Sequence, residues 1–133
     1  MATSQLRPTD VELAILQVLW TQGPSTVRQV HDALSDVRET GYTTTLKLMQ
    51  IMAEKGLVSR DESSRTHVYT AVSTREATQS HLVEDLMQRA FGGSAAALVM
   101  QALSSQPTSS DELREIEQLI EAFRAEQEGG DDD

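Results

Sequence analysis

Apolar residues recur at intervals of three and four positions along the first 56 residues, which predicts three amphipathic helices. The first is expected to begin at Thr9 with a capping box, because the Thr9 hydroxyl and the Glu12 carboxylate can each accept a backbone N–H of the other residue. A second, shorter helix is expected to start with Ser25 as its N-cap. The third is expected to end at Gly56.

After residue 56 the spacing of apolar positions shortens to two. Residues 57–62 (LVSRDE) and 66–72 (THVYTAV) each predict a short strand, and residues 63–65 join them as the turn of a β-hairpin. Three helices followed by a two-stranded hairpin are the element order of a winged helix-turn-helix. In that arrangement the third helix is the one that reads DNA.

Three further apolar stripes at helical spacing follow the hairpin. A capping box between Ser73 and Glu76 is expected to open the first of these helices. The second covers residues 94–103, and the third is expected to run from Ser109 to Glu128. The predicted fold is therefore mainly α with a small β-hairpin, a winged helix-turn-helix followed by three C-terminal dimerisation helices.

The predicted organisation is a winged-helix domain over residues 1–73, a helical dimerisation region over 74–128 and a disordered acidic tail over 129–133. The last three helices carry more apolar side chains than so small a domain can cover, and monomers rarely expose such a patch. We therefore expect a homodimer. The residues expected at its interface are Leu82, Leu86, Phe91, Leu98, Leu113, Ile116, Leu119, Ile120 and Phe123.

The third predicted helix has a face suited to a DNA groove. Its N-terminal turns carry short hydroxyl side chains, and its free N–H groups favour phosphate. A major groove admits one helix, whose N-terminal residues reach the base edges. The residues expected to contact DNA are Thr43, Thr44, Lys47 and Gln50 on this helix and Arg65 at the hairpin tip. A winged helix that binds only protein is the alternative, because threonine-rich helix starts are common and Leu46 and Ile51 on the same face offer no phosphate contact.

The distribution of charge leaves DNA binding open, although the net charge is −10. Residues 1–75 hold eight Lys and Arg against eight Asp and Glu, whereas residues 76–133 hold three against thirteen. The excess of acid therefore lies in the C-terminal part. The neutral N-terminal part can still present a local basic face.

Several classes of function are excluded or disfavoured by composition. The chain has no cysteine, which excludes disulfides, thiolate metal sites and cysteine nucleophiles. No spacing of Ser, His and Asp suggests a nucleophile with its base, so we expect no enzyme activity, no metal site and no cofactor. No apolar run approaches a membrane span and the N-terminus lacks the apolar core of a signal peptide, so we expect no membrane insertion and a cytoplasmic protein.

Several motifs together resemble the BlaI/MecI penicillinase-repressor family of winged-helix transcriptional regulators. They are the opening LRPTDVELAILQVLW, the helix YTTTLKLMQIMAEKGLV, the wing segment RTHVY, and the C-terminal FGGSAAALVMQAL and DELREIEQLIEAF. The resemblance extends from the N-terminal motif to about Phe123.

The resemblance implies a homodimeric repressor of a palindromic double-stranded DNA operator, dimerised by its C-terminal helices. By position, it places DNA contacts on Leu46 as well as on the polar residues named above. It also implies that a membrane sensor-protease relieves repression by cutting the chain, here at Gln101–Ala102. Glycines precede the helix that holds this bond and a polar segment follows it, so local opening is expected to cost less than global unfolding.

Overall fold

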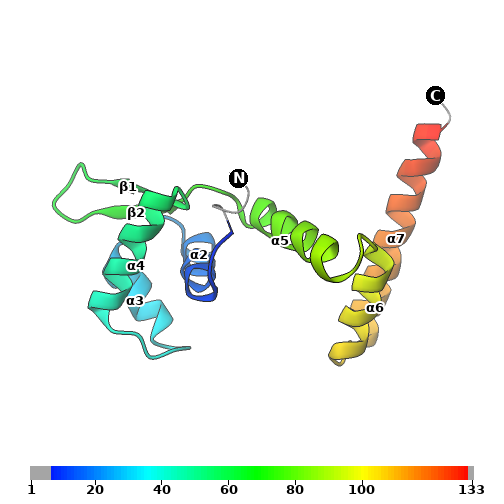
Figure 1. Cartoon of the computed structure of the whole chain (residues 1–133), viewed down its shortest axis with the longest axis horizontal. Coiled ribbons are helices and arrows are strands. Elements are labelled where there is room, and N and C mark those ends of the chain that lie inside the picture. Colours follow the sequence, from blue (N-terminus) through cyan, green and yellow to red (C-terminus); the bar gives the residue numbers. More distant parts are fainter. Residues whose placement is uncertain (1–6, 132–133) are drawn as a thin grey trace. The chain divides into compact units, whose positions relative to one another are not determined.

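The computed structural model describes residues 7–131, and these residues form six helices and two strands. The elements are α2 (Asp10–Gln22), α3 (Val27–Leu34), α4 (Tyr42–Lys55), β1 (Val58–Asp61), β2 (Val68–Ala71), α5 (Arg75–Ala90), α6 (Ala95–Ser105) and α7 (Ser110–Asp131) (Figure 1). The chain divides into two compact units, the first ending at Asp85 and the second beginning at Leu86. The predicted fold class, mainly helical with a β-hairpin, is confirmed.

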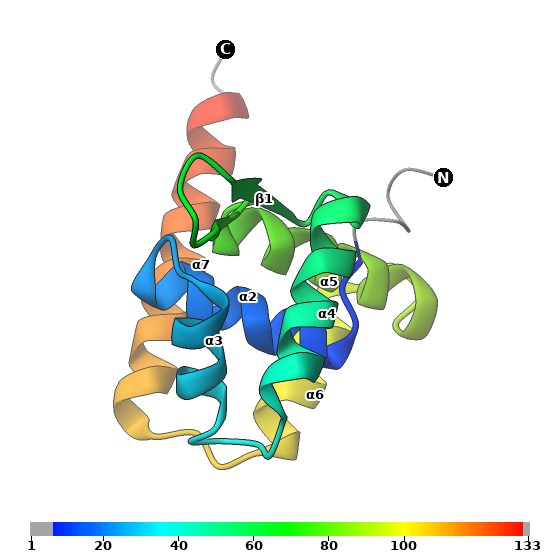
Figure 2. The same cartoon turned by 90° about the vertical axis from the view of Figure 1, so that its left-hand side faces the viewer.

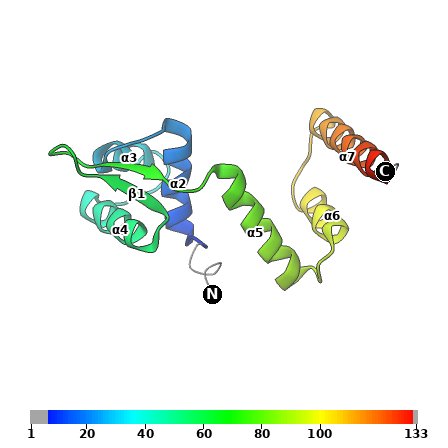
Figure 3. The same ribbon diagram turned by 90° about the horizontal axis from the view of Figure 1, so that it is seen from above.

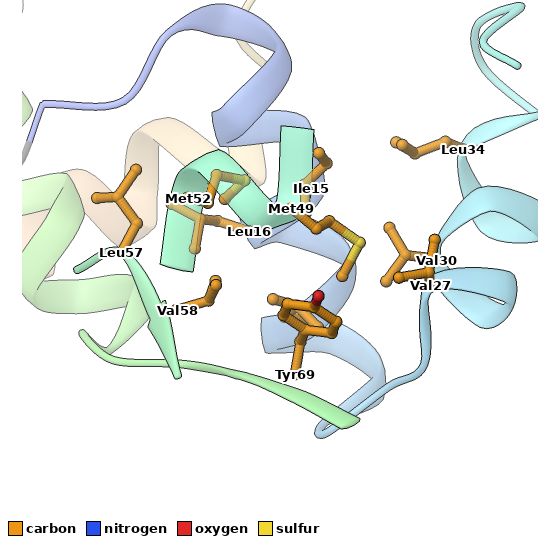
Figure 4. Close-up of a cluster of buried hydrophobic side chains, with 11 residues drawn as sticks. Ile15, Leu16, Val27, Val30, Leu34, Met49, Met52, Leu57, Val58 and Tyr69 are labelled. Carbon is orange, nitrogen blue, oxygen red and sulfur yellow. The ribbon is translucent and has the colours of Figure 1, made fainter. Parts of the chain in front are cut away.

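The first unit is built around one hydrophobic core (Figure 4). Helices α2, α3 and α4 each present an apolar face to it, and the two strands contribute Val58 and Tyr69. The buried residues are Ile15, Leu16, Leu19, Val27, Val30, Leu34, Met49, Met52, Leu57, Val58 and Tyr69. This core holds the three helices and the hairpin as one body.

The capping box predicted for α2 is confirmed. The Thr9 hydroxyl accepts the backbone N–H of Glu12 at 3.2 Å, and the Glu12 carboxylate accepts that of Thr9 at 2.9 Å. At the C-terminal end of α4, Gly56 adopts φ 85°, a left-handed conformation that glycine takes without steric cost. The predicted stop at this glycine is therefore also confirmed.

The predicted cap of α3 is wrong by one residue. Thr26, and not Ser25, accepts the backbone N–H of Gln29, in a complete capping box. Ser25 is buried instead and exchanges two backbone hydrogen bonds with Tyr69 of β2, at 2.8 and 3.0 Å. Because the backbone of Ser25 is hydrogen-bonded to β2, this residue lies in extended structure beside the sheet, and α3 starts after it.

The start of α5 also shifts by one residue. The Thr74 hydroxyl accepts the backbone N–H of Ala77 at 3.1 Å, so Thr74 caps the helix in place of the predicted Ser73. The Ser73 carbonyl accepts a hydrogen bond from the Trp20 indole N–H of α2. A local motif with two adjacent hydroxyl residues allows either start, and this tertiary contact favours the later one.

The hairpin forms an antiparallel wing. Its register pairs Val58 with Ala71 and Arg60 with Tyr69. The loop between the strands covers residues 62–67 and is longer than the predicted turn 63–65. This loop extends beyond α3 and α4 in two perpendicular views (Figures 1 and 3). The first unit is therefore a winged helix-turn-helix with its wing tip beside α4.

The second unit contains the end of α5 together with α6 and α7. Gly92 and Gly93, with φ 57° and 81°, follow α5, and Ser94 caps α6. No residue of α6 is buried. Helix α7 continues to Asp131 and so includes residues 129–131, which the sequence assigned to a disordered tail. No proline interrupts this run, so the helical hydrogen bonds continue; residues 132 and 133 lie outside the described residues.

Candidate nucleic-acid interface

Figure 2 views the first unit from the side of α3 and α4. Along α4 the side chains divide into a buried and an exposed face, as the sequence predicted. Thr45, Met49 and Met52 are fully buried against the core. On the opposite side, four of the predicted DNA-contacting residues of this helix are exposed to solvent. They are Thr43, Thr44, Lys47 and Gln50.

Leu46 and Ile51 differ in their surroundings, although the sequence placed both on the outward face. Leu46 is partly buried and packs against the core, so it supports the base of the exposed face. Ile51 is 36 % exposed and lies one turn farther along the helix. The apolar character of Leu46 is thus explained by packing, whereas nothing in the structure explains an exposed isoleucine at position 51.

A cleft of about 290 Å³ lies between the start of α3, the outward face of α4 and the wing. Three arginines line it, Arg28 from α3 and Arg60 and Arg65 from the hairpin, together with Gln50 of α4 and Tyr42 at its first turn. The structure therefore brings Gln50, Leu46 and Arg65 of the predicted set to one hollow. Arg28, Arg60 and Tyr42 could not be grouped from the sequence, because these residues come from three different elements.

Tyr42 holds part of this cleft in place. The guanidinium of Arg28 lies 4.4 Å from the centre of the Tyr42 ring, within the range of a cation–π contact. The ring of His31 meets Tyr42 edge to face at 5.9 Å. These contacts keep the positive charge of Arg28 at the N-terminal end of α4, where free helical N–H groups also favour an anion.

The wing carries both basic and acidic groups. Arg60 lies 3.4 Å from the Glu62 carboxylate, and Glu62 is 3.9 Å from His67. A hydrogen bond with Tyr69 and the charge of Glu62 raise the pKa of Arg60, so it keeps its charge. By contrast, Lys47 and Arg65 form no ion pair within residues 7–131. Their charges are available to a phosphate.

Behind the exposed face, an ion pair fixes the C-terminal end of α4 to α2. The Lys55 ammonium lies 2.8 and 3.0 Å from the two carboxylate oxygens of Glu12, whose side chain is only 3 % exposed. Burial raises the pKa of Glu12, but the hydrogen bonds from Lys55 and from the Thr9 backbone outweigh it and lower the pKa below its usual value. From the sequence alone, Glu12 was expected only to cap α2, and its pairing with Lys55 was not predicted.

The predicted dimerisation residues lie along apolar stripes that the second unit and the end of the first leave uncovered. Leu86, Leu113, Leu119, Ile120 and Phe123 are exposed, and Phe123 reaches 65 %. The remaining four are partly buried: Leu82, Phe91, Leu98 and Ile116. Leu82 belongs to the first unit by its contacts, and the other three to the second.

The predicted cleavage position lies within α6. Gln101 and Ala102 are both exposed, and the Ser105 hydroxyl donates a hydrogen bond to the Gln101 carbonyl at 2.6 Å. In the part of the chain that the structure describes, no three His, Asp or Glu side chains gather as a metal site requires. None of the described helices is both long and apolar enough to cross a membrane.

A family model described as penicillinase repressor matches residues 8–122. The match covers the winged helix and most of the C-terminal helices. The chain belongs to the penicillinase repressor family. It is therefore a transcriptional repressor of that family and not an enzyme.

Individual relatives agree with this assignment. A transcriptional regulator BlaI of Mycobacterium tuberculosis (strain CDC 1551 / Oshkosh) is 40 % identical over 93 residues, covering 68 % of this chain and 67 % of the relative. A penicillinase repressor of Bacillus licheniformis is 23 % identical over 119 residues, covering 87 % of this chain and 91 % of the relative.

Solved structures of similar fold include a complex of hsRosR-S4, with a TM-score of 0.52 and 20 % identity over 96 % of this chain and 99 % of that one. A MarR family protein from Bacillus stearothermophilus has a TM-score of 0.51 and 16 % identity, over 95 % of this chain and 79 % of that one. At such low identity these likenesses establish the winged-helix fold and nothing further.

Proposed function

We propose that the chain acts as a homodimer in the cytoplasm and represses transcription by placing α4 of each subunit in a major groove of a palindromic operator. The observation that carries the proposal is the exposed row of Thr43, Thr44 and Lys47 beside the arginine-lined cleft. Short hydroxyl side chains permit close approach to base edges, while the arginines meet the sugar–phosphate backbone.

In this complex the residues of α4 and the wing make two kinds of contact, with bases and with phosphates. Thr43 and Thr44 contact bases through their hydroxyl and methyl groups, and Gln50 pairs with an adenine edge. Lys47 and Arg65 bind phosphate. Leu46 lies at the floor of the contact surface, packed against the core.

The cleft extends the contact surface to Arg28 and Arg60. A backbone phosphate seated between α3 and the wing meets both guanidinium groups, which bind phosphate in a forked geometry. The first helix of a helix-turn-helix unit crosses the backbone in this way. These contacts position the protein, and the base contacts of α4 specify the sequence.

The excess of acidic residues in the C-terminal half disfavours contact of that half with DNA. Helix α7 has Asp111 and Glu112 in its first turn and no basic residue in its last turn. Its charge repels phosphate, so the DNA is expected to meet the first unit only.

The experiment begins with selection of bound sequences from a random duplex pool, followed by affinity measurements at rising salt. Removing one phosphate contact with Lys47→Ala or Arg28→Ala should lower the slope of log affinity against log salt by about one. Arg124→Ala, which removes an exposed arginine of α7, is the matched control and should leave the slope unchanged. A wild-type chain that enriches no sequence and binds no duplex would instead support a protein-binding winged helix.

We also propose that repression is released by cleavage at Gln101–Ala102, carried out by a membrane sensor-protease. In support, both residues are exposed and α6 has no buried residue. Gly92 and Gly93 precede the helix, so it can open locally at less cost than the core of the first unit. The hydrogen bond that the Ser105 hydroxyl donates to the Gln101 carbonyl, four residues earlier, is of a kind that slightly destabilises helices.

Cleavage is tested by following the intact mass of the chain in cells during induction. The expected result is a fragment ending at Gln101 that appears before the target genes are transcribed. The fragment retains the winged helix but lacks α7, so the two DNA-binding units are no longer linked. Target genes that switch on while the chain stays intact would show that another off-switch operates.

A further inference from the structure

Helix α5 is attached to the winged helix at several points along its first part. The Trp20 indole N–H, in the last turns of α2, donates to the Ser73 carbonyl at 2.9 Å. The Arg75 guanidinium lies 5.9 Å from the centre of the Trp20 ring and donates to the Thr21 hydroxyl at 3.1 Å. The last turns of α2 therefore hold the residues that begin α5.

Two further contacts extend this attachment along α5. Thr78, one turn into the helix, is buried with 8 % of its surface exposed. The Arg7 guanidinium, just before α2, forms an ion pair with the Asp85 carboxylate at 2.7 Å. The contacts at Ser73, Arg75, Thr78 and Asp85 together define what we call the α5 clamp.

The clamp uses no residue of the proposed DNA-contacting surface. Its members lie in the segment before α2, in α2, just before α5 and within α5 as far as Asp85, whereas the DNA-contacting residues lie in α3, α4 and the wing. Trp20 itself is only partly buried at the edge of the core. Because its N–H contacts Ser73 and its ring contacts Arg75, Trp20 orients the start of α5 in addition to packing at the core.

Helix α5 continues without interruption through the boundary between the units, from Arg75 to Ala90. It therefore links the DNA-binding unit to the helices proposed to dimerise. The direction in which α5 leaves the winged helix then determines how far apart, and at what rotation, a dimer presents its two copies of α4. Half-site spacing is set by that geometry.

We infer that the α5 clamp, through Trp20, Arg75 and Arg7, determines the operator half-site spacing that the repressor accepts. The inference rests on the proposed function, since it requires a dimer on two half-sites. These are positioning residues, because they act on DNA only through the direction of α5. Their loss should affect the choice of spacing and leave the contact of each single unit with its half-site intact.

The size of the effect follows from DNA geometry. Each inserted base pair separates the half-sites by about 3.4 Å and rotates one against the other by roughly 35°. A clamped α5 cannot follow that rotation, so the winged helix of the second subunit loses its half-site. The affinity for the operator then falls toward that of a single winged helix for one half-site, a loss of up to about 10²–10⁴-fold.

The test measures dissociation constants for the best selected operator and for duplexes with one or two base pairs added or removed between the half-sites. Wild type is compared with Trp20→Phe/Arg75→Ala, which keeps an aromatic ring but removes the indole N–H and the guanidinium. The wild type should lose at least about tenfold in affinity per base pair of misspacing, within the span that avidity allows. The variant should lose less than about threefold per base pair and bind the best operator more weakly.

A duplex with a single half-site separates positioning from folding, because its affinity should be the same for both proteins. Arg7→Ala, which removes only the exposed ion pair to Asp85, gives a second and milder variant with an intermediate spacing penalty. Arg114→Ala is the control for loss of an arginine outside the clamp.

Two outcomes of the spacing measurement overturn the inference while leaving the proposed function standing. One is a variant that keeps the full wild-type spacing penalty, and the other is a wild type that binds all spacings alike. A wild type that binds no duplex at all overturns the proposed function and this inference with it. A variant that loses single half-site affinity in parallel assigns the clamp to folding and also overturns the inference.

Discussion

The two units of this chain bury their apolar residues to very different extents. The first encloses a core in which Ile15, Val30, Met49 and Met52 are fully buried. In the second, α6 has no buried residue and Phe123 of α7 is 65 % exposed. The sequences of both units carry apolar stripes at helical spacing, so the difference lies in what each stripe packs against. The first unit supplies its own partner surfaces, whereas the stripes of the second stay largely exposed within one chain, and we propose that a second copy of the chain covers them.

This comparison is tested most severely by placing charges on the uncovered stripe. Ile120→Asp together with Phe123→Asp should produce monomers, because two carboxylates would have to be desolvated in the dimer interface. Operator affinity should fall by about 10²–10⁴-fold, while the thermal unfolding of the winged helix stays as in wild type. Sedimentation velocity and operator titration measure the two effects. Glu117→Gln on the same helix is the control, and a double variant that stays dimeric would contradict the proposed role of α7.

The same truncation in each unit sharpens the comparison. Ile15→Ala should lower the free energy of unfolding by about 2–5 kcal/mol, because it leaves a cavity in a packed core. Ile120→Ala should instead lower the free energy of unfolding only at protein concentrations at which the dimer forms, because the lost contacts lie between subunits. Urea unfolding at two protein concentrations distinguishes them. Equal, concentration-independent losses would mean that both stripes pack within one subunit.

Two neighbouring threonines of α4 allow the same contrast within one helix. Thr44→Ala should cost about 1–3 kcal/mol of operator binding, mainly through one base pair per half-site, and leave stability unchanged. Thr45→Ala should lower stability, since this buried hydroxyl donates to the Gly41 carbonyl at 3.2 Å. Binding isotherms on operator variants and urea unfolding give the two readouts. The assignment of faces is wrong if Thr45→Ala alters base preference and Thr44→Ala does not.

The smallest expected effect is a pH dependence confined to the first unit. The pKa of Glu12 is lowered in the folded state from a usual value of 4.5, so its ion pair with Lys55 contributes stability above that value and loses it as pH falls through the folded pKa. The free energy of unfolding of the winged helix should therefore decline below about pH 4.5. Glu12→Gln should be less stable near neutral pH and show a flatter decline. Urea unfolding between neutral and acidic pH measures both, and identical pH profiles would exclude a contribution from Glu12.

Features that depend on neighbours along the chain were predictable from the sequence. The helical stripes, the hairpin and the stop at Gly56 follow from spacing and from single-residue conformational preferences, which act within a few residues. The division of α4 into a buried and an exposed face followed for the same reason. Once Met49 and Met52 face the core, the positions between them must face outward.

Only the tertiary structure decided which distant residues meet. Ser25 pairs with Tyr69 and so yields the cap of α3 to Thr26, Glu12 pairs with Lys55 across two helices, and Trp20 reaches Ser73. The arginine-lined cleft likewise combines residues from three elements. Periodicity reports which face of an element is apolar but carries no information on the element that will cover it. Pairings between such faces are selected by packing and hydrogen bonding in the assembled fold.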